Sequence, residues 1–357
     1  EEYDDDIYNI NSWGADLSFR ELISLFKDEE LIKPEIQRNY VWDKITASRF
    51  IESILLGLPI PSIFLAKMPD NRMLIVDGFQ RVMSVYDFHS GIFKDGKTFK
   101  LSNSKKINPR WRGKSYIELE PSDQRKIRTT TIHAIIFDQR QPAENDTSLY
   151  QIFERINTGG RSLSPQEIRN CVYHNQFNKT LIKLNKNNDW RKLFGTSQSD
   201  DRMKDIEFIL RFFALQSPEI KERPTGQISL KKFLNTFMGD KKNNKETTLK
   251  EFEKDFINVM EFLNQRIGNV AFTTLNSTKK GVSRFNGTVF DAIAIATNHV
   301  LKNPQLNPNF DDLKVKRKQL LSSTAFQDLL RNRTTNVDRI NDRIDFASKV
   351  LYGVRYK

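Results

Sequence analysis

Val76-Asp77-Gly78-Phe79-Gln80-Arg81 is the stretch at which a strand pattern ends and a helix pattern begins. An apolar run at 73–76 leads into it, and Val82, Val85 and Phe88 recur after it at helical spacing. A glycine between a strand and a helix lets backbone N–H groups face an anion. The stretch therefore predicts a strand, a tight turn and a helix whose first turn fits a phosphate.

The side chains of this turn suggest separate chemical roles. We expect Arg81 to be exposed and to hold a phosphate with its guanidinium, so that Arg81→Ala should leave the melting temperature nearly unchanged. Asp77 is the candidate for binding a metal ion or positioning a water, and Gly78 and Gln80 complete the site. Upstream, Gln37-Arg38 offers a second arginine. Alternatively, Asp77 and Gln80 form a helix-capping pair and the turn is structural.

Further patterns place a small sheet around this turn. Ser18 and Glu21 fit a capping box, and a second helical pattern at 50–55 stops at Gly57. The apolar runs at 63–65 and 73–76 are typical of paired strands. The run at 132–137 predicts a buried strand in which His133 is a core residue.

After about residue 147 the patterns are helical. The expected helices span 164–174, 177–186, 205–215, 230–237, 249–266, 286–301 and 339–351. At 357 residues the chain is long for one core and suits two. We therefore predict an α+β protein with a first domain at 1–146 and an α-helical domain at 147–357.

The segment 153–169 carries a second set of polar residues. A helix is expected to end at Asn157 before two glycines, and Ser164-Pro165 starts the next. Capping does not require Asn157, Arg155, Arg161 or Arg169, so these side chains are candidates for facing the same nucleotide. The alternative is that Arg155 and Arg169 pair with nearby glutamates at the surface, where such pairs contribute little stability.

Composition bears on partners and compartment. A net charge of +12 favours polyanions, nucleic acid first, although Lys-rich composition also serves solubility alone. Residues 91–128 interleave basic and aromatic side chains and suggest a basic loop region. Cys171 is a single cysteine, which excludes an intramolecular disulfide and is typical of the cytoplasm. No stretch approaches the length of a membrane helix, so no membrane association is expected.

Four blocks carry a family resemblance. In chain order they are Pro34…Gln37-Arg38…Trp42, Leu58-Pro59-Ile60-Pro61, Asp77-Gly78-Phe79-Gln80-Arg81 and Phe153…Asn157-Thr158-Gly159-Gly160…Leu163-Ser164…Glu167-Ile168-Arg169. Together they resemble the domain-of-unknown-function family 262. That family includes the GmrS half of GmrSD-type type IV restriction systems and the N-terminal half of phosphorothioate-sensing defence nucleases. The later segments 283–291 and 338–344 resemble stand-alone members.

The resemblance implies a ParB/sulfiredoxin-like N-terminal lobe with a small mixed sheet, which handles nucleoside triphosphates, followed by an α-helical domain. It implies catalytic roles for Asp77, Gln80 and Arg81. It also implies nucleotide binding by Gly78, with Gln37 and Arg38 nearby, and the candidates Arg155 and Asn157 from the second set of polar residues would add contacts to the same nucleotide. A divalent metal, Mg2+, would be held at Asp77. Phe79 departs from the family, which usually has a glutamine there. A phenyl ring cannot donate or accept the hydrogen bonds of that amide, so the resemblance implies triphosphate binding more directly than hydrolysis.

The functional prediction is a triphosphate-binding, DNA-associated module of a restriction or phage-defence system, which hydrolyses the triphosphate. A second hypothesis is a non-catalytic DNA-binding adaptor for a separate HNH nuclease subunit, because no histidine cluster of that kind is present in the sequence. A third is a DNA-nicking enzyme with Asp77 as metal ligand. Homo-oligomerisation remains open, and enzymatic activity depends on which hypothesis holds.

Overall fold

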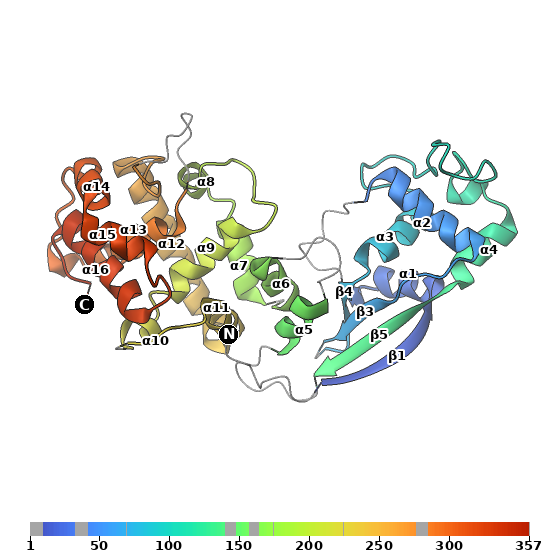
Figure 1. Ribbon diagram of the computed structural model, residues 1–357, viewed down its shortest axis with the longest axis horizontal. Helices are drawn as coiled ribbons and strands as arrows, with labels where there is room; N and C mark the ends of the chain where they lie inside the picture. The colour runs from blue at the N-terminus through green and yellow to red at the C-terminus, as the bar shows by residue number, and fades with distance from the viewer. Residues whose placement is uncertain are drawn as a thin grey trace. The chain divides into compact units, whose positions relative to one another are not determined.

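The computed structural model describes residues 10–32, 42–68, 70–139, 148–156, 164–173, 175–223, 225–275 and 285–356. Contacts divide the chain into two compact units, Glu1–Ser162 and Leu163–Lys357. The described strands all lie in the first unit, and the second is helical (Figure 1). The α+β prediction is confirmed. A division by contacts does not test where a domain folds independently, so the boundary after residue 146 stays a prediction.

The first unit is built on a five-stranded mixed sheet with the order β1-β5-β3-β4-β2. Its strands are β1 (Ile10–Ser18), β2 (Leu31–Ile32), β3 (Ile63–Lys67), β4 (Met73–Asp77) and β5 (Thr131–Gln139). β3 pairs antiparallel with β4, as predicted, and parallel with β5. The sequence analysis did not identify β1, which pairs antiparallel with β5 along all nine of its residues. β4 thus lies beside β3 in the sheet, and β4 ends at Asp77.

Helices pack on this sheet and close the first core. They are α1 (Phe19–Lys27), α2 (Lys44–Leu56), α3 (Phe79–Ser90), α4 (Pro121–Thr129) and α5 (Ser148–Ile156), with the short helix η2 (Tyr116–Glu118). Figure 1 shows α1 to α4 on one side of the sheet. The predicted capping box of Ser18 and Glu21 starts α1, and Gly57 ends α2 with a φ of 75°. Both predictions rest on local chain geometry and are confirmed.

His133 is not a core residue, contrary to the prediction. Successive side chains of a strand point to opposite faces, so Ile132 and Ala134 enter the core while His133 faces away. Its side chain is half exposed, and its Nδ1 lies 2.8 Å from Oδ1 of Asp16 on β1. His133 therefore belongs to the outer face of the β1–β5 pair.

The second unit is a helical bundle. Its helices are α6 (Pro165–Val172), α7 (Gln176–Leu184), α8 (Asn188–Phe194), α9 (Lys204–Ala214), α10 (Pro218–Lys221), α11 (Leu230–Gly239), α12 (Glu246–Arg266), α13 (Gly287–Lys302), α14 (Leu313–Ser322), α15 (Thr324–Arg331) and α16 (Val337–Tyr352), with the short η3 (Lys241–Asn244) and η4 (Pro304–Leu306). α13 is buried along most of its length and packs against α16, α12 and α9. The seven predicted helices are found, and α8, α10, α14 and α15 are not among them.

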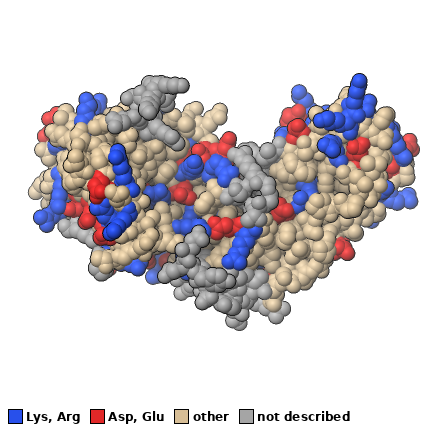
Figure 2. All heavy atoms as spheres, viewed as in Figure 1, with Lys and Arg blue, Asp and Glu red and all other residues tan. Residues whose placement is uncertain are grey.

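Basic side chains are visible on both units in Figure 2. Within the described part of the chain, no helix is long and apolar enough to cross a membrane.

Candidate functional site

The turn after β4 begins a helix without a side-chain cap. Gly78 is the N-cap residue of α3 and has a φ of 96°, and it offers no side chain to accept a capping hydrogen bond from the first turn. A Cβ atom on Gly78 would lie 2.2 Å from Cγ2 of Ile63 on β3, so only glycine fits. The capping pair of Asp77 and Gln80 is not formed. The strand–turn–helix prediction is confirmed.

Arg81 turns back over this glycine. Its Nη2 donates to Oδ2 of Asp77 at 2.6 Å and to the carbonyl oxygen of Ser62 at 3.0 Å. The side chain is only 17% exposed, whereas that of Asp77 is 42% exposed. The expectation of an exposed Arg81 is therefore wrong, because its guanidinium reaches back from the first turn of α3 to the end of β4 and to the backbone of Ser62.

The Arg81 guanidinium retains unused donor capacity. Among the described residues its buried Nε has no hydrogen-bond partner. A guanidinium carries five N–H donors and matches the paired oxygens of a phosphate. The geometry thus supplies a pre-positioned cation beside an uncapped helix start.

Gln80 holds the neighbouring chain segment. Its Oε1 accepts a hydrogen bond from the backbone N–H of Trp42 at 3.1 Å, and Nζ of Lys94 donates to the Trp42 carbonyl at 2.9 Å. The Trp42 ring packs edge-on against Phe50. The predicted residues Gln37 and Arg38 precede Trp42 and lie outside the described residues. Gln80 therefore holds the backbone at Trp42, a role that the sequence analysis missed.

Phe79 is a residue of the hydrophobic core of the first unit. Its side chain is 4% exposed and packs with the apolar residues of the first unit. A ring in this position is explained by burial and offers no hydrogen bond to a ligand.

Helix α5 lies beside β4 in the first unit. This helix packs against β4, the strand that ends at Asp77, and its Tyr150 and Phe153 are buried. Arg155 is exposed in the last turn of α5. Asn157 and Arg161, which follow, lie outside the described residues.

Arg169 has a structural role, contrary to the nucleotide-facing interpretation. It is 1% exposed, and its Nε donates to Oδ1 of Asn235 at 2.7 Å. Its Nη1 donates to Gln166 at 3.0 Å and to Glu207 at 2.9 Å. The Ser164 and Glu167 capping box that starts α6 is confirmed. Arg169 joins α6, α9 and α11 and is closed to a ligand.

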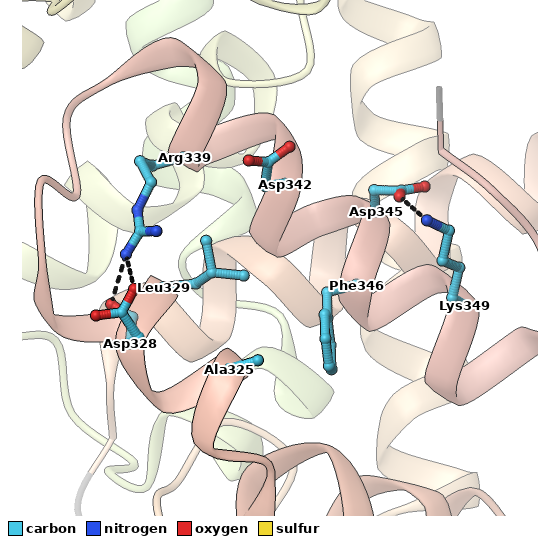
Figure 3. Close-up of a pocket in the computed structure, with 8 residues that line it drawn as sticks. All are labelled: Ala325, Asp328, Leu329, Arg339, Asp342, Asp345, Phe346 and Lys349. Carbon is cyan, nitrogen blue, oxygen red and sulfur yellow. Dashed lines mark hydrogen bonds and ion pairs between the residues drawn. The ribbon is translucent and has the colours of Figure 1, made fainter.

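The helical unit has a pocket of about 370 Å3 between α15 and α16, whose lining is acidic (Figure 3). Arg339 pairs with Asp328, and Nζ of Lys349 lies 2.5 Å from Asp345. Figure 3 shows Asp342 between these pairs, joined to neither. Three carboxylates against two cations repel a phosphate, so this pocket does not suit a nucleotide.

The described residues contain no group of three His, Cys, Asp or Glu side chains that could hold a metal ion. A metal at Asp77 would accordingly take most of its ligands from a bound nucleotide and from water, as Mg2+ commonly does.

Cys171 is expected to be unreactive in the folded protein. It is fully buried on α6, and burial raises the pKa of its thiol well above the ordinary value. Native protein should resist alkylation by iodoacetamide at neutral pH, and denatured protein should react, as measured by mass spectrometry. Rapid labelling of the native chain would contradict this burial.

Comparison with known proteins finds a family match that covers most of the first unit and the start of the second. Residues 19–174 match the family model described as the N-terminal domain of the GmrSD restriction endonuclease. We call residues 19–174 the GmrSD-type domain, after the family that they match. The GmrSD-type domain includes α1 to α6, the turn at Gly78 and the α5 segment, so every predicted site residue falls inside it.

The other two comparisons give no further information on the family or the fold. No curated protein matches the chain. A solved structure of a Pnob8-like ParB-N domain is similar at 12% identity, with 96% of this chain and 98% of that chain covered and a TM-score of 0.23. A likeness of this size does not define the fold, which rests on the strands and helices described above.

Proposed function

We propose that the chain binds and hydrolyses a nucleoside triphosphate and associates with DNA, as a cytoplasmic module of a restriction or phage-defence system. The GmrSD-type domain supports the restriction setting, and the net charge of +12 supports an anionic partner. The observation that carries the proposal is Arg81, held by Asp77 and Ser62 beside the uncapped start of α3.

In this proposal the phosphates lie at the first turn of α3. Its backbone N–H groups and the helix dipole attract an anion, and Gly78 allows the close approach. Arg81 contacts the phosphates, Gln80 holds the backbone at Trp42, and Gln37 and Arg38 would supply a second contact. Arg155 and Asn157 contribute from the α5 side.

Asp77 would hold Mg2+ or position the attacking water. One exposed carboxylate fits a metal whose other ligands are triphosphate oxygens and waters. When bound, the metal would neutralise charge that develops on the phosphates.

A non-catalytic adaptor is the second candidate, and the buried Phe79 favours it. The family's usual glutamine is replaced by a core residue, so one polar group is missing from the motif. In the adaptor, a separate HNH nuclease subunit would perform the chemistry while this chain binds DNA.

The test is a titration of the full chain with Mg2+ and each nucleoside triphosphate, with phosphate release measured in parallel. Because Arg81 is largely buried, Arg81→Lys is preferable to Arg81→Ala, since it keeps the charge and removes the fork. We expect it to weaken nucleotide binding by about tenfold or more, the value of one charge-assisted hydrogen-bond pair. Asp77→Asn should retain binding and suppress Mg2+-dependent phosphate release.

Arg72→Lys is the matched control, because Arg72 pairs with Asp70 at an exposed turn between β3 and β4. It should leave nucleotide affinity unchanged. Full affinity in Arg81→Lys would overturn the site assignment. Nucleotide binding without phosphate release in the wild type would favour the adaptor.

A further inference from the structure

The positive charge of this chain is concentrated in one segment. Residues 91–130, the basic segment, hold eleven Lys and Arg against four Asp and Glu, a net charge of +7 out of the total of +12. We propose that the exposed cations of the basic segment bind the phosphate backbone of duplex DNA. This inference rests on the DNA association in the proposed function and names the surface that provides it.

The basic segment is a folded part of the first unit. Its aromatic residues Phe93, Phe99, Trp111 and Tyr116 are all buried, with exposed fractions of 7% or less. Its backbone is fastened to α2, since Ser102 N donates to Oγ of Ser48 at 2.9 Å. The charges are thus displayed on a fixed framework, which lowers the entropic cost of binding.

The acidic residues of the segment are largely used within it. Asp123 is 7% exposed and accepts from Arg110 at 3.0 Å and from the Trp111 indole at 2.8 Å. Hydrogen bonds from Ser115, with a smaller effect of Lys100, lower the pKa of Glu118 to about 2. Glu118 therefore stays ionised and partners one lysine at 3.1 Å.

A set of exposed cations is left available for a ligand. Within the described ranges, none of the following takes part in an ion pair: Lys97, Lys105, Lys106, Arg125 and Lys126. Figure 2 shows blue Lys and Arg side chains on the surface at the end of the first unit that carries α2 and α4. Such a surface attracts a polyanion and releases its counterions.

The buried aromatics decide between kinds of nucleic acid. Single-strand binding relies on side-chain rings that stack on unpaired bases, and the four rings of this segment are closed to bases. Contacts of lysine with phosphate carry no sequence information. The surface therefore suits duplex DNA of any sequence.

The test compares two adjacent lysine pairs in the full chain. Lys105→Ser with Lys106→Ser removes two exposed charges from the basic segment. Lys241→Ser with Lys242→Ser removes two exposed charges from η3 in the helical unit. Binding of a labelled duplex of mixed sequence is followed by fluorescence anisotropy over a series of salt concentrations.

We expect the pair in the basic segment to weaken duplex binding by about tenfold or more at low salt. The slope of log affinity against log salt should become shallower by about 2, one for each lost phosphate contact. The η3 pair should change affinity and slope much less. Equal losses in both pairs, no loss in the first pair, or no binding of duplex by the wild type would overturn the proposal.

Two further measurements identify the ligand. Tighter binding of a single strand than of a duplex of the same length would overturn the assignment to duplex. Triphosphate affinity should be unchanged by the Lys105 and Lys106 substitutions, and its loss would assign these cations to the nucleotide. Because nucleotide binding at Arg81 is measured separately, failure of the DNA surface and failure of the nucleotide site give different results.

Discussion

Asp291→Ala should destabilise the helical unit by about 3–5 kcal/mol, the usual cost of removing one partner from a buried ion pair. Asp291 is fully buried on α13, and its Oδ2 accepts from Arg211 and, at 3.4 Å, from Nη2 of Arg343. Arg343 is 1% exposed. Without the carboxylate, two guanidinium groups would face each other in the core of the bundle.

The pKa of Arg343 supports the expectation that Asp291→Ala destabilises the protein. Burial lowers the pKa of Arg343 to about 10, so the group remains charged at neutral pH. Its stabilising partner is therefore required throughout the neutral range, and loss of Asp291 leaves an uncompensated charge. Unfolding in urea, followed by circular dichroism, measures the change.

Glu246→Ala is the control for Asp291→Ala. Glu246 pairs with Lys250 at the exposed start of α12, where both side chains are more than 70% exposed, and its loss should not move the urea midpoint. Wild-type stability in Asp291→Ala would show that the three charged groups do not stabilise the bundle. Asp291 and Arg343 belong to the two segments that the sequence analysis associated with stand-alone family members, and they meet in this ion cluster.

Gly78→Ala should destabilise the first unit by roughly 2–5 kcal/mol. A left-handed residue other than glycine costs about 1–2 kcal/mol, and forcing a methyl group into a packed contact costs about 1–3 kcal/mol more. The new Cβ would lie 2.2 Å from Cγ2 of Ile63, which is fully buried on β3. Thermal and urea unfolding measure the loss.

Gly91→Ala separates the two causes in the same helix. Gly91 ends α3 with a φ of 82°, and no atom lies within 4 Å of its added Cβ. It should lose only the conformational part, about 1–2 kcal/mol. If both variants lose the same stability, the contact with Ile63 is not a constraint on the turn.

Parts of the fold could be predicted because their causes are local. The capping box of Ser18 and Glu21 and the start of α6 at Ser164 and Pro165 involve residues three positions apart or fewer. Gly57 and Gly78 mark positions where the backbone needs positive φ. The alternation of β5 also contained the information that His133 faces outward, although its apolar neighbours suggested burial.

Long-range contacts could not be predicted in the same way. β1 has a weak strand pattern, and its partner β5 lies more than 100 residues later. Gln80 binds Trp42 from 38 positions away, and Arg169 binds Asn235 from 66 positions away. A polar residue in a sequence gives no sign of whether its partner is a ligand or another part of the chain.

The sequence alone therefore determined the α+β class, the helix limits set by caps and glycines, and the position of the turn at Gly78, because hydrophobic period and backbone conformation act over a few residues. The tertiary structure decided which polar side chains remain for a ligand. It buried Arg169 in a network and placed Arg81 between Asp77 and Ser62, and it exposed the lysines of residues 91–130 over buried rings. Those outcomes depend on which distant elements meet, since a buried polar group must find its partner wherever the fold brings one.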